Sequence, residues 1–596
     1  MVNPFRLLKP RYVIGSLLAG LLAALIALPV QAQIVDENRL LNADREPENW
    51  ILHHRTYDGQ RFSPLDQINL DTVGDLRITT TLMLGGIEGA GRYGSGVLEG
   101  TPLVENGFMY VTDGWGGVYK IDVRDGQRAE IVWKMDPGVE KVFAAEVTCC
   151  GIDNRGAGLW RDQVISVALD GRLISTNKET GEVTWERKVA DPALGETLTL
   201  APLIVKDLGI IGSSGAEYGI RGWIDATDLN TGEQVWRTHT IPGAGEPGNE
   251  TWLNDAWQTG GGSIWVTGTY DPELNLMYWG TGNPGPDWDA EYRPGDNLYT
   301  DSLLAMDPDT GEIKWWFQYT PNDPYDYDEI AEHILVEIDG KKLALHAGRN
   351  GFFYGFDRVT GEFLYGKQYV DFVNWTPGLD PKTGVPLSYD PARQVQLYAP
   401  GTSPRRGEFG VFCPDIIGGK NWMPAAYSPE TELMYIPSLE TCRILLGTKQ
   451  EPNGPRDIFL GADFAAKEDK HGNAKPSAPI KERAALTAVS ARTGEVVRRT
   501  WLDLRPNGAL ATAGDLVFAG DQAGELMAFD ARTLEKVWSW NVGSPIKAPP
   551  MSYSWNGKQY LAILVGGPAP KNAPIIEKRP GVEFYSPAAM LFIFTL

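Results

Sequence analysis

The sequence is poor in histidine, in cysteine and in positive charge. Its 596 residues include six His and four Cys, and 77 acidic residues outnumber 54 basic ones, for a formal net charge of −23. So few imidazoles argue against a histidine-rich metal site. This charge argues against binding of nucleic acid, whose phosphates require a basic surface. It is compatible with a soluble protein that binds a basic partner. No Cys-x-x-Cys-His pattern is present, so we expect no covalent haem on this chain.

Long apolar runs are lacking too, except at the amino terminus. Arg6, Lys9 and Arg11 precede an apolar run over 12–29, and small residues then precede a cleavage-like site after Ala32. This is the pattern of a secretory signal peptide. We expect residues 1–32 to be removed, leaving a periplasmic protein with no membrane span. An uncleaved anchor is the alternative, because the run approaches the roughly 18 residues that a span needs.

Glycine, proline and aromatic residues are plentiful, and a turn recurs along the chain. Asn177–Gly181 precedes Trp185, Asp228–Gly232 precedes Trp236, and Asp307–Gly311 precedes Trp315. Further copies are 122–126, 357–361, 490–494 and 530–534. Alternating apolar residues around turns indicate antiparallel strands, and about four strands recur per unit, as in a propeller blade.

The repeat therefore predicts an all-β fold, an eight-bladed β-propeller spanning 33–596 as one domain, with seven blades as the competing count. Separate β-sandwiches would not explain a recurring Thr-Gly-Glu turn. The strands expected over 559–565 and 591–596 would form the last blade, closed by a strand from the mature amino terminus. The stretches 371–405 and 447–479 lack strand alternation, and we expect them to be loops, where function tends to lie.

The four cysteines are Cys149, Cys150, Cys413 and Cys442. Export allows disulfides to persist, and three pairings can be drawn. A bond between Cys149 and Cys150 would be strained, because neighbouring Cα atoms lie about 3.8 Å apart, below the usual disulfide window of roughly 4.4–6.8 Å. Each could instead pair with a distant cysteine, or Cys413 could pair with Cys442, which leaves the neighbours to bond or stay free.

A second group of candidates carries carboxylate and amide oxygens. Glu217 and Asn283 lie in glycine-rich turns, and Asp326 and Asp328 are two residues apart. In an extended segment such a pair faces one side and could share a hard cation such as Ca²⁺. Any one of these residues alone is more often a turn or capping residue.

The chain resembles the quinoprotein alcohol dehydrogenases over nearly all of its mature length. The resemblance is carried by Cys149-Cys150 with Arg155-Gly156, Ser214–Glu217, Gly260–Trp265, Gly280–Asn283, Gly295–Tyr299, Asp326–Asp328 and Gly418–Trp422. It implies an eight-bladed propeller that binds pyrroloquinoline quinone and one metal ion, and oxidises small alcohols.

The resemblance also implies the roles of individual residues. A Cys149–Cys150 disulfide would stack on one face of the quinone and Trp265 on the other, Arg349 would lie near the reactive oxygens, and Asp326 would be the general base. The remaining cofactor contacts would be Glu99, Arg155, Thr199, Ser214, Gly215, Ala216, Ser263, Asn421 and Trp422. The metal ligands would be Glu217, Asn283, Asp326 and Asp328.

Asp328 bears on the identity of the metal. Calcium-dependent members have a small uncharged residue there, whereas lanthanide-dependent members resemble this Asp-Tyr-Asp pattern. Electrostatics leads to the same expectation, since a third carboxylate attracts a trivalent ion more strongly than it attracts Ca²⁺. We therefore expect a lanthanide, with Ca²⁺ as the alternative and Asp328 as a solvated loop acid in that case.

Some residues depart from the family pattern, and other functions stay open. Ser263 stands where Thr is common, Asn507 where many members carry Trp, and Met423 where many alcohol enzymes have His, so the substrate is less certain than the reaction. A sugar or polyol dehydrogenase of the same fold is the main rival, and a non-catalytic propeller scaffold is another. The resemblance implies a separate soluble cytochrome c as electron acceptor, and the sequence leaves a homodimer open.

Overall fold

The computed structural model describes residues 34–452, 454–568 and 588–596, and residues Val35–Leu596 cluster into one unit. The expected signal peptide lies outside the described residues, so its removal and the division of the chain at residue 32 stay predictions. In the part that is described, the α-helices are α1 (Glu37–Leu41) and α2 (Lys141–Glu146). No described helix has the length and apolar content needed to cross a membrane.

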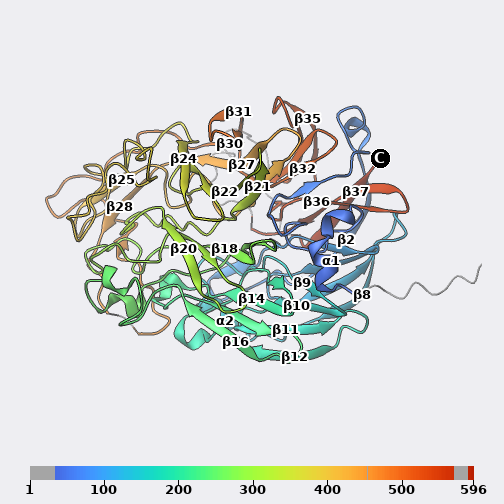
Figure 1. The fold of residues 1–596 in the computed structure, drawn as a ribbon, viewed down its shortest axis with the longest axis horizontal. Coiled ribbons are helices and arrows are strands. Elements are labelled where there is room, and N and C mark those ends of the chain that lie inside the picture. The colour runs from blue at the N-terminus through green and yellow to red at the C-terminus, as the bar shows by residue number, and fades with distance from the viewer. Residues whose placement is uncertain (1–33, 453, 569–587) are drawn as a thin grey trace, which may run out of the picture. The chain divides into compact units, whose positions relative to one another are not determined.

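Eight antiparallel sheets of four strands follow one another along the described chain, one of them extended by a fifth strand (Figure 1). This confirms the all-β propeller predicted from the repeat, and the sheets number eight. The first blade consists of β5 (Leu103–Glu105), β6 (Phe108–Thr112), β7 (Val118–Asp122) and β8 (Glu130–Met135), and the second of β9 (Gly158–Trp160), β10 (Gln163–Val167), β11 (Arg172–Asn177) and β12 (Val183–Lys188). The third blade consists of β13 (Leu203–Val205), β14 (Leu208–Gly212), β15 (Trp223–Asp228) and β16 (Gln234–His239), and the fourth of β17 (Thr269–Asp271), β18 (Leu276–Gly280), β19 (Ser302–Met306) and β20 (Ile313–Gln318).

The other four blades complete the array. The fifth blade consists of β21 (Ile334–Ile338), β22 (Lys341–Ala347), β23 (Phe352–Asp357) and β24 (Phe363–Gln368), and the sixth of β26 (Ala426–Ser428), β27 (Leu433–Glu440), β30 (Arg483–Ser490) and β31 (Val496–Leu502). The seventh blade consists of β32 (Pro506–Thr512), β33 (Leu516–Asp521), β34 (Glu525–Asp530) and β35 (Lys536–Asn541), and the eighth of β36 (Met551–Trp555), β37 (Lys558–Val565), β38 (Met590–Thr595) and β2 (Arg77–Met83). Outside the blades lie β1 (Phe62–Ser63), which extends the β32 sheet, the hairpin β3 (Glu88–Ala90) with β4 (Tyr93–Ser95), and the small sheet of β25 (Phe409–Phe412), β28 (Arg443–Gly447) and β29 (Ala462–Asp463). The 3₁₀ helices are η1 (Ala43–Arg45), η2 (Val73–Asp75), η3 (Pro192–Leu194), η4 (Ala216–Tyr218), η5 (Asn249–Thr251) and η6 (Asp255–Thr259).

The last blade joins a strand from the amino-terminal part of the chain to the carboxyl-terminal strands. Strand β2 pairs antiparallel with β38, from Arg77 opposite Thr595 to Met83 opposite Met590, and Figure 1 shows β2 beside the carboxyl-terminal strands. This confirms the expected closure by an amino-terminal strand. Closure pairs the carboxyl-terminal strand β38 on both sides, with β2 and with β37, while β2 forms an edge of this blade.

The recurring turn has a structural reason. Trp236 of the third blade packs on Gly311 of the fourth, and its Nε1 donates to the carbonyl of Pro308 at 2.9 Å. Gly311 has φ +72°, and a Cβ there would lie 2.5 Å from the indole ring. Trp185 meets Gly232 in the same way. Glycine is thus required both for the left-handed turn and for the approach of the preceding blade's tryptophan.

Apolar side chains fill the space between neighbouring blades. Ile334, Leu345 and Phe353 of the fifth blade pack with Met434 and Ile436 of the sixth, and all five side chains are fully buried. Alternation along each strand places such residues on the faces between sheets. The packed blades form a rigid support for the loops that leave their ends.

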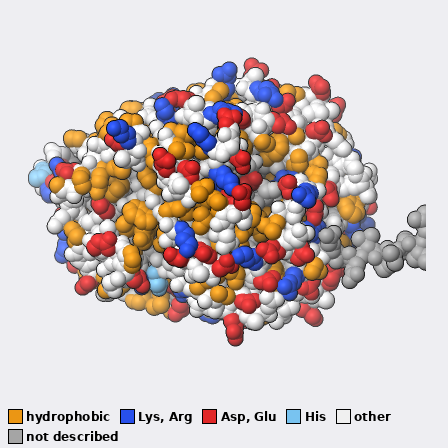
Figure 2. Space-filling view, in the orientation of Figure 1, with side chains coloured by type: hydrophobic (Ala, Val, Ile, Leu, Met, Phe, Trp, Pro, Cys, Tyr) orange, Lys and Arg blue, Asp and Glu red, His pale blue; other side chains and the backbone are white. Residues whose placement is uncertain are grey.

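The two predicted loop regions have little regular structure. Residues 371–405 contain no strand, and 447–479 contain the two-residue strand β29 after β28 ends. On the face shown in Figure 2, acidic and basic side chains are interspersed with apolar ones and do not separate by sign. That face therefore offers no continuous basic surface for nucleic acid.

Candidate active site

Loops that lead into the first strands of the blades meet at a cavity of about 270 Å³. Glu99 precedes β5, Arg155 precedes β9, Thr199 precedes β13, Trp265 precedes β17 and Arg505 precedes β32. Small-ligand pockets have volumes of roughly 300–1,000 Å³, so this cavity is slightly smaller than that range. Because its wall comes from residues about 400 positions apart, the cavity depends on closure of the whole propeller.

Most of the residues predicted from the sequence line this cavity. They are Glu99, Cys149, Cys150, Arg155, Thr199, Ser214, Gly215, Glu217, Ser263, Trp265, Asp326, Asp328, Arg349, Asn421 and Trp422. Ala216 and Asn283 are not part of the wall. Ala216 is buried beside Gly215 in η4, and Asn283 lies behind Asp328, to whose Oδ1 its backbone N–H donates at 2.8 Å. The structure gathers these residues, and their individual roles stay predictions.

The segment Asp326–Asp328 is held by its buried tyrosine. The Tyr327 hydroxyl donates to the Pro414 carbonyl at 2.7 Å, and the Tyr327 N–H donates to Asp323. Asp326 has φ +66°, so the segment is not extended there, contrary to the geometry assumed from the sequence. Both aspartates nevertheless reach the cavity. A non-glycine residue with positive φ is uncommon and persists where the surrounding structure holds the backbone in that conformation.

Several buried carboxylates meet at this end of the cavity. Burial, and then the charges of Asp287 and Asp328, raise the pKa of Asp326 well above its usual value. Burial and Asp328 also raise the pKa of Glu217. Close carboxylates oppose each other's ionisation, and a hard cation would relieve this repulsion. The Asn283 Oδ1 is buried and has no hydrogen-bond partner among the described residues, so it too is an acceptor awaiting a donor or a cation.

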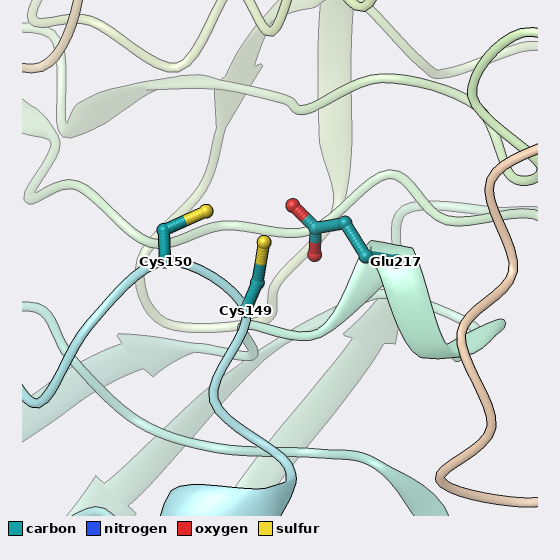
Figure 3. A group of neighbouring side chains, drawn as sticks. All are labelled: Cys149, Cys150 and Glu217. Carbon is teal, nitrogen blue, oxygen red and sulfur yellow. The ribbon is translucent and has the colours of Figure 1, made fainter. Parts of the chain in front are cut away.

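Three of the four predicted metal ligands, Glu217, Asp326 and Asp328, line the cavity but do not form a tight cluster. In the described chain, one group of at least three His, Cys, Asp or Glu side chains has its ligand atoms within 4.8 Å of one another. This group consists of Cys149, Cys150 and Glu217. Figure 3 shows the Glu217 carboxylate directed toward Cys149. Asp328 is instead paired with Arg349, at 3.0 Å. This pairing and the repulsion among the acids explain why they stand apart.

The neighbouring cysteines differ from the expectation. Cys149 and Cys150 are both unbonded, whereas the family resemblance implied a disulfide between them. Adjacent Cα atoms in a trans peptide lie closer than the disulfide window allows, which opposes the bond. The disulfide seen among the described residues joins Cys413 to Cys442, one of the pairings that the sequence left open.

The loop of Cys149 and Cys150 is fixed by the β3–β4 hairpin. Arg92 donates to the Cys149 carbonyl at 3.0 Å and to the Tyr218 hydroxyl at 2.7 Å. Tyr93 donates to the Thr148 carbonyl at 2.6 Å. These bonds connect the cysteine loop to η4, which carries Glu217, so the two elements keep a common position.

Arg155 organises the other end of the cavity. Its guanidinium pairs with Glu99 at 3.0 Å and with Asp153 at 3.4 Å, and lies 4.9 Å from the ring centroids of both Trp265 and Trp422. Burial raises the pKa of Glu99 to about 7 although Arg155 opposes the shift. This end combines an ion pair with two indole rings, which suits a flat anionic ligand.

Arg349 is positioned from behind by a second buried acid. The Glu329 carboxylate accepts the Arg349 backbone N–H at 3.0 Å and lies 2.9 Å from His346 Nε2. Lys420 pairs with Glu332 at 2.9 Å, both fully buried, and donates to the Asn421 carbonyl at 3.0 Å. Such contacts hold Arg349 and Asn421 in place before any ligand binds.

The sequence reasoning missed four charged residues of this site. Asp153 and Arg505 line the cavity, and Asp287 and Lys547 act electrostatically on residues that do. Asp153 lies inside the Cys149–Arg155 motif, so proximity could have signalled it. Asn507, noted as a departure, does not line the cavity. It is fully buried in β32, and its Nδ2 donates to the Ile546 carbonyl at 2.7 Å.

Comparison with known proteins places this geometry in context. The family model described as "Glucose/ethanol/alcohol dehydrogenase, beta-propeller domain", of the PQQ type, matches residues 50–370 and 492–561. The quinoprotein alcohol dehydrogenase PedH of Pseudomonas putida is 35% identical over 99% of this chain and 98% of its own length. The putative dehydrogenase XoxF of Paracoccus denitrificans is 34% identical over 90% of each chain.

Solved structures agree with these relatives. A europium-containing methanol dehydrogenase superimposes with a TM-score of 0.81 at 30% identity, covering 94% of this chain and all of that one. A quinohemoprotein alcohol dehydrogenase of Pseudomonas putida superimposes with a TM-score of 0.82 at 33% identity, over 94% of this chain and 82% of that one.

Proposed function

The chain belongs to the pyrroloquinoline quinone-dependent alcohol dehydrogenase family, and from this premise we propose that it oxidises primary alcohols to aldehydes in the periplasm with a lanthanide-bound quinone. The observation that carries the proposal is the convergence of Asp326, Arg349 and Glu217 on the cavity that also holds Arg155 and Trp265. A base, a buried acid set and an aromatic anion site are thus within reach of one bound ligand.

Asp326 is the group best suited to take the alcohol proton. Its carboxylate is buried at the cavity wall, and burial with Asp287 and Asp328 raises its pKa well above the usual range. A carboxylate at the cavity wall can accept the proton of a hydroxyl group that binds beside it. The Arg349 Nη1 donates to the Asp326 carbonyl at 3.2 Å, so the guanidinium keeps a defined position beside the base.

The residues present fit the quinone cofactor. The Arg155 Nε is buried and has no hydrogen-bond partner among the described residues, which leaves a donor for an anionic planar ligand. Glu99 Oε2 and Asp153 Oδ1 lie at ion-pair distance from the same guanidinium. Thr199 Oγ1 accepts from Arg155 at 2.8 Å and lies 3.1 Å from Ser214 Oγ. When bound, the quinone would supply the two-electron acceptor for the alcohol carbon. The chain's own part is to orient it between Trp265 and the Cys149–Cys150 loop.

The charge of the cavity favours a trivalent ion. Its wall carries the carboxylates of Glu99, Asp153, Glu217, Asp326 and Asp328 against three guanidinium groups. A cofactor with several carboxylates adds further negative charge. Coulomb attraction grows with the charge of the cation, so a lanthanide gains more here than Ca²⁺ does. Glu217, Asn283, Asp326 and Asp328 would hold it, with Asp328 exchanging its Arg349 partner for the metal.

The electrons must leave the protein after each oxidation. We assign this step to a soluble cytochrome c, because the chain has no haem-attachment pattern and its net charge of −23 favours a basic partner. A periplasmic location follows from the proposed signal peptide. The same setting would supply small alcohols as substrates.

The test is dye-linked oxidation of ethanol by the mature protein, reconstituted with pyrroloquinoline quinone and either La³⁺ or Ca²⁺. Activity with La³⁺ alone supports both the reaction and the ligand role of Asp328. Activity with Ca²⁺ alone keeps the reaction and removes Asp328 from the metal site. No turnover with either ion across a panel of small alcohols would refute the proposed substrate class and move the choice to sugars or polyols.

A further inference from the structure

Arg505 is a cavity residue without an anionic partner at ion-pair distance among the described residues. It lies immediately before β32 and forms part of the wall together with Glu99, Ile416 and Trp422. Its Nε and Nη1 atoms are buried and have no hydrogen-bond partner in the described protein. A buried guanidinium atom that has lost water without gaining an acceptor is costly, so the side chain is poised for an acceptor that enters the cavity.

The acids around Arg505 are engaged elsewhere or lie too far for an ion pair. Asp415, Glu482 and Glu99 stabilise its charge from a distance, while burial lowers its pKa to about 10. Asp415 pairs with Arg443 at 3.2 Å, and Glu99 pairs with Arg155 at 3.0 Å. The other two guanidinium groups of the wall are also committed, Arg155 to Glu99 and Arg349 to Asp328.

Lys547 adds a second cation on the same side. It lies in the segment before β36, and Glu99 raises its pKa while burial and Arg505 lower it, to about 8 overall. No ion pair within 4 Å joins Lys547 to an acid among the described residues. Arg505 and Lys547 are both half-buried, and the charges of both act on the Glu99 carboxylate. Such a pair is an electrostatic site for an anion.

We propose that Arg505, supported by Lys547, binds a carboxylate that enters the cavity. A guanidinium presents its N–H groups as a planar fork that matches a carboxylate. Two molecules could bring that group, the quinone cofactor or an alcohol substrate that carries a carboxylate. This proposal rests on the proposed function, since both molecules belong to it. In the second case the enzyme would prefer hydroxy acids over neutral alcohols of the same size.

Two measurements distinguish the sources. Apo-protein is titrated with pyrroloquinoline quinone by fluorescence quenching, for the wild type, Arg505→Gln, Arg505→Lys and Lys547→Gln. The holoenzyme is then assayed with 3-hydroxypropanoate and with 1,3-propanediol, and the ratio of the two kcat/KM values is compared. Arg498→Gln is the control, because Arg498 is an exposed arginine of β31 outside the cavity. Circular dichroism melts establish that each variant is folded.

A lost charge-assisted contact is expected to change the affected quantity by about 10- to 100-fold. If quinone affinity falls in Arg505→Gln and the substrate ratio is unchanged, the cofactor supplies the carboxylate. If the ratio falls and quinone affinity is unchanged, the substrate supplies it. Arg505→Lys should retain part of either effect, and Lys547→Gln should show a smaller loss.

Equal quinone affinity and an equal substrate ratio in wild type and Arg505→Gln would overturn the proposal. If Arg505→Gln does not fold, the same two readouts in Lys547→Gln decide the question, and no change there overturns it. A wild-type protein that binds no quinone is a different result, because it refutes the proposed function itself.

Discussion

The Arg349 guanidinium donates to the Asp328 carboxylate at 3.0 Å, and both side chains are 6% exposed. The second Asp328 oxygen accepts the Asn283 N–H at 2.8 Å. Both oxygens of the proposed extra metal ligand are thus already occupied by donors. A cation bound to Asp328 would compete with Arg349 for the charge of this carboxylate and would leave the guanidinium more available to another ligand in the cavity. Metal binding and the position of Arg349 are therefore coupled.

Asp328→Ala should abolish lanthanide-dependent activity and spare part of any activity with Ca²⁺. The variant loses one of three carboxylates, and we expect Tb³⁺ affinity, followed by luminescence, to fall by about tenfold or more, where each factor of ten corresponds to about 1.4 kcal/mol. Asp136→Ala, an exposed acid outside the cavity, is the control. Unchanged Tb³⁺ affinity together with full lanthanide activity would remove Asp328 from the metal site.

Asp326→Asn should lower kcat by about 10²- to 10⁴-fold, because an amide cannot accept the alcohol proton. Quinone binding to the apo-protein, measured by fluorescence, should change much less, since Asn keeps the size of the side chain. The kcat value is measured by dye reduction at saturating ethanol. A variant that retains wild-type kcat would show that another group is the base.

Glu99→Gln should make the stability of the apo-protein less dependent on pH. The pKa of Glu99 is raised to about 7 in the folded protein, above its unfolded value, so its contribution is complete below the unfolded pKa and is lost as pH rises to about 7. Relative to the wild type, the variant should gain on the order of 1–3 kcal/mol between pH 4.5 and 8. Thermal melts at both pH values measure this gain, and a difference that does not change with pH contradicts it.

Replacing Cys413 and Cys442 together by Ser should destabilise the protein by about 3–4 kcal/mol, since the bond closes a loop of 29 residues. That loop carries Asn421 and Trp422, so quinone affinity should fall as well. Urea unfolding and quinone titration measure the two effects. Asp415 and Arg443 form an ion pair next to the disulfide, at 3.2 Å, and Asp415→Asn/Arg443→Gln in the double-Ser background should weaken the loop further. An unchanged urea midpoint in the double-Ser variant would refute the stabilising role.

Gly311→Ala should destabilise the contact between the third and fourth blades. The new Cβ would lie 2.5 Å from the Trp236 ring in a residue at φ +72°. Gly340→Ala is a matched control, because Gly340 has φ +73° and a Cβ there would meet no described atom within 4 Å. The control should lower the free energy of unfolding by about 1–2 kcal/mol, because only the backbone is strained there. Gly311→Ala should lower it clearly more. Equal urea midpoints for the two variants would show that the tryptophan contact does not constrain the turn.

Much of the fold could be predicted from the sequence. The Thr-Gly turns and the alternating strands around Gly232 and Gly311 are local patterns, and they predicted the blades and their number. The closure by an amino-terminal strand was also predicted, because the last two strands needed a partner. The motifs around Arg155, Glu217 and Asp326 identified most of the cavity wall through the family resemblance.

Tertiary structure decided what the local patterns could not. Arg505 and Lys547 act electrostatically on Glu99, more than 400 residues away in sequence, because closure of the propeller brings the entry loops of seven blades to one cavity. Asp328 pairs with Arg349, a contact that depends on the distance between two loops and not on spacing along the chain, and the structure leaves Cys149 and Cys150 unbonded. The sequence by itself determined the repeating sheets and their turns through periodicity and glycine placement. The balance of charges in the cavity arose only when distant loops met.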